Sequence, residues 1–281
     1  MAKLEDLFGD IVNKARRGLK LTEAELGKKV GLTEQQIKEI IASKWKPDDA
    51  TLRKLAGALG LGADRLIAIA NDKYSPAAVD LARWGCAAQI TSPFEDYFVH
   101  TYMIWDKKTK ETVLFDTGTQ ADPIHDVIRK NGLTVKMLCL THTHPDHIVV
   151  LDEIREKYNP PIIASQAEPV DGAKFVREGD TLKCGGVTLR VLETDGHSPG
   201  GFTFVASGLG SGVPEMAVVG DAIFAGSMGG PMVSYERLHS NVKNKILKLA
   251  DVTVLMPGHG PLTTVGEEKR NNPFFSQSGA S

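Results

Sequence analysis

The chain has 281 residues, with 33 Lys and Arg against 35 Asp and Glu, so its formal charge of −2 is neither that of a strongly basic nucleic-acid-binding protein nor that of an acidic one. Its three cysteines are scattered without C-x-x-C spacing and are expected to be buried apolar residues or free thiols in a reducing compartment. No apolar run approaches the roughly 20 residues of a membrane span, and the N-terminus has no apolar signal core. We therefore expect a cytoplasmic protein without membrane contact, built from one or two domains.

The first 70 residues have a helical pattern that predicts four or five short helices. Thr22 followed by Glu25 forms a capping box, which predicts a helix through Val30 that a glycine then ends. Further helices are predicted over residues 33–43 and 51–60. The apolar residues recur at helical spacing and predict a small helical core: Leu21, Leu26, Val30, Leu32, Ile37, Ile40, Leu52, Leu55, Leu59 and Leu66.

The stretch L-T-E-A-E-L-G-K-K-V-G-L-T-E-Q-Q-I-K-E-I-I resembles the phage-repressor-like helix-turn-helix family, and the resemblance covers roughly residues 8–70. It implies that the helix starting at Thr33 reads the major groove of DNA through four side chains: Glu34, Gln35, Gln36 and Lys38. Residues 1–75 carry 14 Lys and Arg against 11 Asp and Glu. Because phosphate neutralisation supplies most non-specific affinity, we expect weak DNA binding, or binding as a homodimer. The alternative is a helical module for oligomerisation or protein contact.

The chain changes character at N-D-K-Y-S-P, residues 71–76, after which β-rich runs dominate. We expect two domains, an all-α domain over residues 1–72 and a larger domain over residues 73–281. We also expect the two domains to have separate cores and a flexible join at residues 74–76.

Four β-rich runs of the second domain each end in a loop that carries candidate metal ligands. The first run, residues 135–140, leads into T-H-T-H-P-D-H at residues 141–147, where His142 and His144 point the same way if the segment is extended. The other three loops are T-D-G-H-S-P-G at 194–200, G-D at 220–221 and P-G-H-G at 257–260. Imidazole and carboxylate groups suit zinc, iron or manganese. Four strand ends meeting at one rim would build a site with six or seven ligands.

In this order the motifs resemble the metallo-β-lactamase-fold hydrolases, and most closely their glyoxalase II-like (hydroxyacylglutathione hydrolase-like) branch, over roughly residues 85–275. The resemblance implies an α+β sandwich of two β-sheets flanked by helices, placed after the all-α domain. It implies that Asp116, in L-F-D-T-G, accepts the outer N–H of a metal-bound imidazole. It also implies a ligand set, with His142, His144 and His197 on one metal, Asp146, His147 and His259 on a second, and Asp221 bridging them.

Seven ligands exceed the four that a tetrahedral zinc takes and suit two divalent metals about 3.5–4 Å apart. Zinc is expected first, with iron or manganese as alternatives. Coordination lowers the pKa of water from about 15.7 to about 7, so a bridging hydroxide could attack a thioester, ester or lactone without a serine or cysteine nucleophile. The second metal would polarise the scissile carbonyl. Asp146 could act as general base if only one metal binds.

Two other functions stay open at the level of sequence. The first is a mononuclear iron dioxygenase of the persulfide type, which would use only His142, His197 and Asp221. The second is a transcriptional regulator whose metal domain senses a metabolite. Metal content and oxygen consumption would separate the first from a dinuclear hydrolase, and sequence-specific DNA binding would reveal the second.

The residues that select the substrate are less well marked. After Gly229, Gly230 stands where many glyoxalase II-like and persulfide dioxygenase proteins carry an arginine, so a small acyl substrate is expected without a specific handle for glutathione. Tyr235 and His239 lie four residues apart on a helix predicted over residues 235–249, and therefore share a face. They either line a pocket or simply pack.

Overall fold

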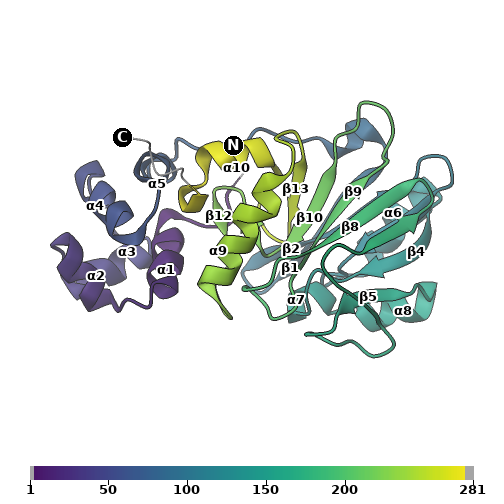
Figure 1. Ribbon diagram of the computed structural model, residues 1–281, viewed down its shortest axis with the longest axis horizontal. Coiled ribbons are helices and arrows are strands. Elements are labelled where there is room, and N and C mark those ends of the chain that lie inside the picture. Colours follow the sequence, from purple (N-terminus) through teal and green to yellow (C-terminus); the bar gives the residue numbers. More distant parts are fainter. Residues whose placement is uncertain (1–2, 276–281) are drawn as a thin grey trace.

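The computed structural model describes residues 3–275 and consists of a small helical domain beside a larger two-sheet sandwich (Figure 1). The predicted α+β class is confirmed, because two mixed six-stranded sheets flanked by helices follow an all-α domain. Within residues 3–275, no helix is both long and apolar enough to cross a membrane.

The helical domain contains α1 (Phe8–Gly18), α2 (Glu23–Val30), α3 (Glu34–Ile41), α4 (Asp49–Leu59) and α5 (Ala63–Ala70). The capping box is present, because Thr22 accepts from the backbone N–H of Glu25 and the Glu25 carboxylate accepts from that of Thr22. α3 ends two residues earlier than predicted, since Ser43 takes a left-handed backbone conformation with φ 52°. α4 begins two residues earlier than predicted, because Asp48 caps it.

The first sheet has the strand order β1-β2-β3-β4-β5-β6, antiparallel up to β3 and parallel from β3 to β6. Apolar side chains of α6 and α8 pack against its outer face. The elements of this half are η1 (Leu81–Trp84), β1 (Ala87–Phe94), β2 (Tyr97–Trp105), β3 (Glu111–Phe115), α6 (Asp122–Asn131), β4 (Thr134–Cys139), α7 (Pro145–Ile148), α8 (Leu151–Tyr158), β5 (Ile162–Ser165) and β6 (Lys174–Val176).

The second sheet has the order β14-β13-β10-β9-β8-β7, with β10 and β13 parallel. Its elements are β7 (Thr181–Cys184), β8 (Val187–Glu193), β9 (Phe202–Ser207), β10 (Met216–Gly220), α9 (Tyr235–Asn244), η2 (Ile246–Lys248), β13 (Val254–Pro257), β14 (Thr263–Thr264), α10 (Val265–Asn271) and η3 (Pro273–Phe275). A short hairpin, β11 (Ile223–Phe224) and β12 (Ser227–Met228), follows β10. The helix predicted over 235–249 was wrong beyond Asn244, where the chain leaves the α-helix at Lys245 and continues as a 3-10 turn.

One apolar core lies between the two sheets and includes Tyr102, Phe115 and Phe204. A second core contains residues of the helical domain together with residues of the second sheet, the β11–β12 hairpin, α9 and α10. The expectation of separate cores was therefore wrong. The physical reason is that α5 buries Leu66, Ile67, Ile69 and Ala70 and contacts η3 of the second domain as well as α1 and α4.

Contrary to the expected flexible join, the segment at residues 74–76 is held by a hydrogen bond at its first residue. The Tyr74 hydroxyl donates to the Glu268 carboxylate at 3.4 Å. Nearby, the N–H of Gly62 donates to the carbonyl of Pro273 at 2.8 Å. The boundary at residue 72 itself stays a prediction.

Candidate metal centre

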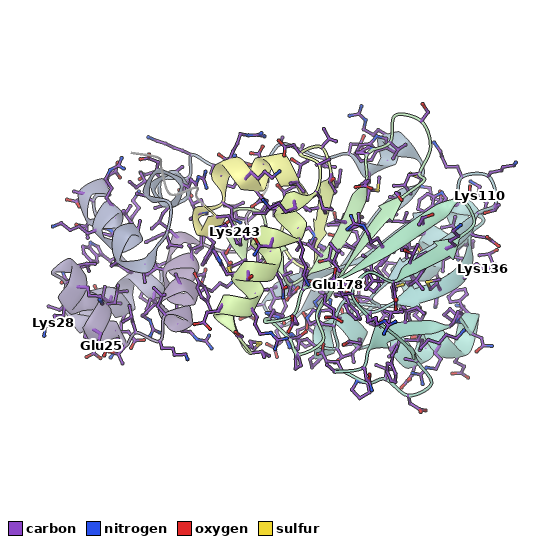
Figure 2. The ribbon with its side chains drawn as sticks, viewed as in Figure 1. Glu25, Lys28, Lys110, Lys136, Glu178 and Lys243 are labelled. Atoms are coloured by element: carbon purple, nitrogen blue, oxygen red, sulfur yellow. The ribbon has the colours of Figure 1, made fainter. Side chains whose placement is uncertain are left out.

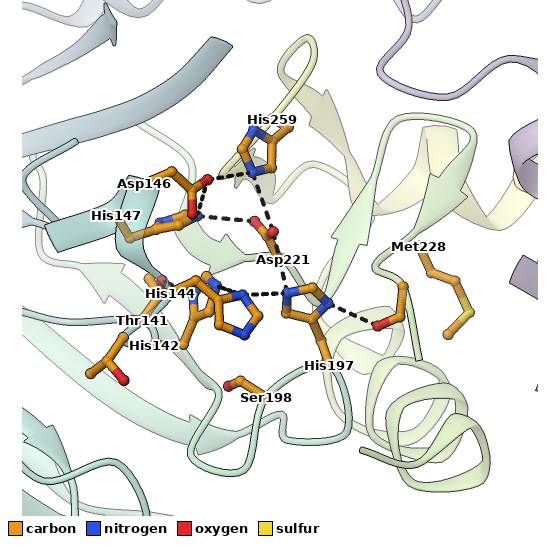
Figure 3. A network of polar contacts seen from close by, with 12 residues as sticks. Thr141, His142, His144, Asp146, His147, His197, Ser198, Asp221, Met228 and His259 are labelled. Atoms are coloured by element: carbon orange, nitrogen blue, oxygen red, sulfur yellow. Dashed lines mark hydrogen bonds and ion pairs between the residues drawn. The ribbon is translucent and has the colours of Figure 1, made fainter. Parts of the chain in front are cut away.

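All seven residues predicted as ligands lie close together at one edge of the sandwich (Figure 3). They come from the loops or short helix that follow β4, β8, β10 and β13, as the motif pattern predicted. The set is His142, His144, Asp146, His147, His197, Asp221 and His259.

The first group of ligands consists of three imidazoles. The Nδ1 atom of His144 lies 3.1 Å from Nε2 of His142 and 3.0 Å from Nε2 of His197. One proton on His144 cannot satisfy two neighbouring nitrogens as two separate hydrogen bonds, whereas three lone pairs can share a cation. The donor set therefore fits a metal ion.

The second group adds a carboxylate to two imidazoles. Oδ2 of Asp146 lies 3.3 Å from Nε2 of His259 and 3.7 Å from Nε2 of His147. All three side chains are buried. A buried carboxylate beside two ring nitrogens is also a donor set that suits zinc, iron or manganese.

Asp221 lies between the two groups. Its Oδ2 atom is 3.4 Å from Nε2 of His197 and 3.3 Å from Nε2 of His259, and its Oδ1 atom is 3.4 Å from Nε2 of His147. Oδ1 of Asp221 and Nε2 of His147 are both buried without a hydrogen-bond partner. Because buried polar atoms are rarely left unpaired, these two atoms fit a site that a metal ion completes.

Two glycines give the ligands room. A Cβ atom at Gly258 would lie 2.2 Å from Oδ1 of Asp221 and 2.7 Å from the ring of His147. A Cβ atom at Gly229 would lie 1.8 Å from the carbonyl oxygen of Asp221 and 3.1 Å from Nδ1 of His197. Any side chain at either position would displace a candidate ligand.

The electrostatics of the centre differ from residue to residue. Burial lowers the pKa of His142 and of His197, which keeps both rings neutral and able to present a lone pair. Burial raises the pKa of Asp221, but the adjacent His259 and His147 outweigh that effect and hold it well below its usual range. Asp221 therefore stays ionised in the interior.

The two histidines beside the carboxylates behave in the opposite way. Burial lowers the pKa of His147, but the charge of Asp221 and the hydrogen bond to Asp116 outweigh it and raise the pKa to about 10. Burial is likewise outweighed at His259, where Asp221 and Asp146 raise the pKa to about 11. In a metal-free chain, protons on these two rings would balance the buried carboxylates.

Asp116 makes the contact that the sequence predicted. Its Oδ2 atom accepts from Nδ1 of His147 at 2.9 Å and from the hydroxyl of Thr141 at 2.7 Å, while Oδ1 accepts from the backbone N–H of Thr141 at 2.7 Å. Asp116 has a left-handed backbone conformation with φ 56°, which aspartate tolerates better than most residues. These contacts fix the orientation of His147, with Nε2 directed at Asp146 and Asp221.

Sequence reasoning missed Glu168, which joins two ligand loops. Its carboxylate accepts from the hydroxyl of Thr143 at 3.1 Å, from the hydroxyl of Ser198 at 2.9 Å and from the N–H of Gly200 at 2.9 Å. Thr143 lies between two ligands of the first loop, and Ser198 follows His197. Glu168 gave no signal because it stands alone in a polar turn after β5.

His259 is held by neighbours on β2. Its Nδ1 atom lies 2.7 Å from the carbonyl oxygen of Phe98, and the ring of His100 contacts the carbonyl of Gly260 at 2.8 Å. The Tyr102 hydroxyl donates to the carbonyl of Pro257 at 2.6 Å. The first contact favours a proton on Nδ1 of His259 and leaves Nε2 for the centre.

Of the two interpretations of Tyr235 and His239, the structure supports packing. The two rings stack with centroids 5.9 Å apart, and His239 stacks on Phe275 at 5.0 Å. Nε2 of His239 is also within 3.0 Å of the carbonyl oxygen of Phe274.

With fold and site in place, comparison with known proteins identifies the class. The model of the metallo-beta-lactamase superfamily matches residues 95–259, and the chain belongs to that superfamily. A helix-turn-helix family model matches residues 12–66, so the helical domain is a helix-turn-helix domain. The protein is a metallo-hydrolase of the superfamily with this domain at its N-terminal side.

Particular relatives agree with the glyoxalase II-like resemblance. Hydroxyacylglutathione hydrolase GloC of Haemophilus influenzae is 30% identical over 199 residues, covering 62% of this chain and 91% of the relative. The BLEG-1 B3 metallo-beta-lactamase superposes with a TM-score of 0.59 at 28% identity, covering 68% of this chain and 100% of the other. TTHA1623, solved in a di-iron-bound form, has a TM-score of 0.54 at 25% identity, covering 66% of this chain and 99% of the other.

Proposed function

We propose that the chain is a dinuclear hydrolase that cleaves a thioester, ester or lactone. The observation that carries this proposal is the position of Asp221, whose carboxylate lies within 3.4 Å of ligand nitrogens from both groups. A carboxylate so placed can serve two cations at once. Zinc is the metal we expect first, and iron and manganese suit the same donors.

We assign His142, His144 and His197 to one metal, Asp146, His147 and His259 to the other, and Asp221 to both. Potential ligand atoms of His142, His147 and Asp221 also lie within 4.8 Å of one another, which joins the two sets. When bound, the metals would supply Lewis acidity and lower the pKa of a coordinated water towards neutrality.

The protein's own contribution is orientation. Asp116 and the carbonyls of Phe98 and Gly230 accept from the Nδ1 side of three ligand rings, which leaves Nε2 of each ring for the metals. Asp146 would be the general base if a single metal binds.

No covalent nucleophile is needed in this proposal. Cys86, Cys139 and Cys184 are buried free thiols. Burial raises the pKa of each thiol, which suppresses the reactive thiolate form at neutral pH. We therefore expect no acyl-enzyme intermediate.

We propose that the acyl group of the substrate lies against aromatic side chains, and that the site has no specific handle for glutathione. The rings of Tyr97 and Phe224 lie 5.2 Å and 5.7 Å from that of His259. On the N-terminal segment, the backbone and Cβ of Glu5 lie close to Gly260. Gly230 replaces the arginine common in glyoxalase II-like proteins. Hydroxyacylglutathione therefore belongs in the substrate panel as one thioester among several.

The test combines elemental analysis with turnover of a thioester, ester, lactone and β-lactam panel. We expect about two metals per chain at saturation, hydrolysis that a chelator abolishes, and near-normal turnover after Cys86→Ala or Cys184→Ala. One metal at saturation would overturn the dinuclear centre. A single iron with oxygen consumption would instead support the dioxygenase alternative.

We propose DNA binding as a second function of the helix-turn-helix domain. In α3, Glu34 and Lys38 are half exposed and form an i,i+4 ion pair, and Gln35 is also exposed. Glu25 and Lys28 on α2 lie at the end of the molecule remote from the sheets (Figure 2). The exposed side chains of α3 are therefore accessible to a duplex.

Selection from random DNA duplexes, followed by binding assays on Gln35→Ala and Lys38→Ala, tests the second function. An enriched motif whose binding depends on these residues is expected, and light scattering should show a dimer, because two recognition helices must meet two half-sites. Absence of enrichment would leave oligomerisation or protein contact as the role of the domain.

A further inference from the structure

The helical domain reaches the catalytic domain through a buried polar contact. Asp6 and Lys14 form an ion pair in which both side chains are largely buried. The Lys14 ammonium donates to the carbonyl of Met228 at 2.9 Å, and the hydroxyl of Ser227, which is 1% exposed, donates to the Asp6 carboxylate at 2.5 Å. Both catalytic-domain partners belong to strand β12, so α1 and the segment before it hold one strand of the β11–β12 hairpin.

The same hairpin is connected to the metal centre, because its first strand begins two residues after Asp221. After β12 the chain is again beside the start of the hairpin, where the N–H of Gly229 donates to the carbonyl of Ala222 at 3.4 Å. The carbonyl oxygen of the following residue, Gly230, lies 2.9 Å from Nδ1 of His197. The hairpin therefore connects a bridging ligand at its start to the orientation of a second ligand at its end, and Met228 appears with these ligands in Figure 3.

Lys14 also contacts the side of the hairpin that faces the other group of ligands. Its ammonium lies 4.9 Å from the centre of the Phe224 ring, within the range of a cation–π contact. The Phe224 ring lies edge-to-face with that of His259 at 5.7 Å. One lysine of the helical domain thus contacts Phe224, which packs on His259, and Met228, which lies two residues before the Gly230 carbonyl that orients His197.

From these contacts we propose that Lys14, held by Asp6, is a positioning residue for the metal centre. Met228 and Gly230 are separated by a single residue, so the Met228 carbonyl that Lys14 holds and the Gly230 carbonyl that orients His197 lie on one short stretch of backbone. Outer partners of metal-bound imidazoles typically change metal affinity by about 10–100-fold. The helix-turn-helix domain would then be a structural part of the hydrolase, and this inference rests on the metal site of the proposed function.

Linkage makes the relation reciprocal. If docking of α1 tightens metal binding, metal binding must tighten docking of α1 by the same factor. Any ligand of the helical domain that loosens α1 would weaken metal binding.

The experiment compares two junction cations that differ in their direct partners, because Lys14 donates to strand β12 and Arg65 donates to backbone carbonyls of residues 269 and 272. Lys14→Met is combined with Asp6→Asn, because a buried carboxylate left without its partner would destabilise the chain for an unrelated reason. The matched control is Arg65→Met, since Arg65 also comes from the helical domain and donates to catalytic-domain carbonyls, those of Asn272 and Lys269 at 3.0 and 3.1 Å. Ser227→Ala is a milder second variant that frees Asp6 from β12.

Zinc and cobalt affinity are measured by chelator competition, together with the visible spectrum of the cobalt form and the urea midpoint of the metal-free chain. We expect the double variant to lose metal affinity by less than the roughly 10–100-fold that loss of a direct partner of a ligand ring costs, and to change the cobalt spectrum. Ser227→Ala should lose less in the same direction, and Arg65→Met should lower only the urea midpoint. Equal affinity losses in the double variant and Arg65→Met, or none in either, would overturn the proposal.

If the double variant fails to fold, Ser227→Ala against Arg65→Met decides on the same readouts. Because affinity is measured without substrate, a wild type that binds metal but hydrolyses nothing would contradict the proposed function and leave this comparison intact.

Discussion

Two buried polar clusters lie next to the β11–β12 hairpin, and they differ in whether hydrogen bonds within the protein satisfy their polar atoms. The first is the ligand cluster, in which Oδ1 of Asp221 and Nε2 of His147 have no hydrogen-bond partner. The second, here called the Glu268 cluster, surrounds the fully buried carboxylate of Glu268 at the junction with the helical domain. That carboxylate accepts from four donors: the Thr263 hydroxyl, the Tyr74 hydroxyl, the Asn272 amide and the N–H of Gly226.

The difference shows how to separate a functional cluster from a structural one. Both clusters are rich in polar side chains and both are buried, so composition and burial alone do not distinguish them. The Glu268 cluster is complete without any other atom, whereas the ligand cluster directs lone pairs at one another. Buried acceptor atoms that converge on one point without hydrogen-bond donors indicate a cation site.

The largest expected effect is at the centre of the ligand cluster. Asp221→Asn keeps the shape of the side chain but removes the charge that both groups share, so metal content should fall below about one ion per chain and hydrolysis by roughly 10³-fold or more. Metal analysis and turnover measure this. The matched control is Asp195→Asn, which changes a carboxylate that contacts Asn241 and Arg237 and belongs to neither ligand group. Loss of metal in both variants would contradict a special role for Asp221.

The two ligand groups should separate when one histidine is removed from each. His144→Ala and His259→Ala each affect one group only, so each variant should retain about one metal per chain. His125→Ala is the control, because His125 contacts Tyr158 and Glu153 instead of the centre. Mass spectrometry under native conditions gives the stoichiometry. If either ligand variant still held two metals, the assignment of that group would be wrong.

A smaller effect is expected from the carboxylates that support the ligands. Asp116→Asn breaks a direct contact with the ring of His147 and should weaken metal binding by about 10–100-fold. Glu168→Gln changes only hydrogen bonds to the loops and should weaken binding less than Asp116→Asn does. Chelator competition ranks the two, and the reverse order would show that loop anchoring matters more than ring orientation.

The contribution of the Glu268 cluster to the free energy of unfolding should depend on pH and not on metal. Burial raises the pKa of Glu268 to about 7, although its hydrogen bonds oppose the shift. Compared with a glutamate of ordinary pKa, the free energy of unfolding therefore falls by roughly 3 kcal/mol as pH rises from about 4.5 through 7. Glu268→Gln stays neutral, and its amide can donate to the two hydroxyls while its oxygen accepts from Gly226 and Asn272.

The variant should therefore gain stability over the wild type by up to that amount between pH 5 and pH 8. Urea unfolding of metal-free protein across this range measures the effect. A constant difference between the two proteins over that range would place the pKa of Glu268 near its usual value.

What the residues alone predicted was local, whereas the grouping of distant loops at one site was predicted through the order of the motifs and the family resemblance. Distant contacts outside those motifs were missed. The capping box at Thr22 and the ligand motif at residues 141–147 each lie within a few residues, so backbone geometry alone carries them. Asp116 was assigned only because the family resemblance supplied its partner 31 residues away. The contact of Asp6 with Ser227 joins residues 221 positions apart. Nothing local marks such a pair, and the shared core was missed for the same reason.

That shared core has a consequence for synthesis of the chain. The helical domain leaves the ribosome first, yet part of the apolar surface that covers it comes from residues between Leu192 and Phe275. At about 5–20 residues per second, the side of α5 that meets them stays uncovered for about 10–40 s. During that time a nascent chain carries an open apolar surface, and chaperones or a neighbouring nascent chain would compete with the catalytic domain for it.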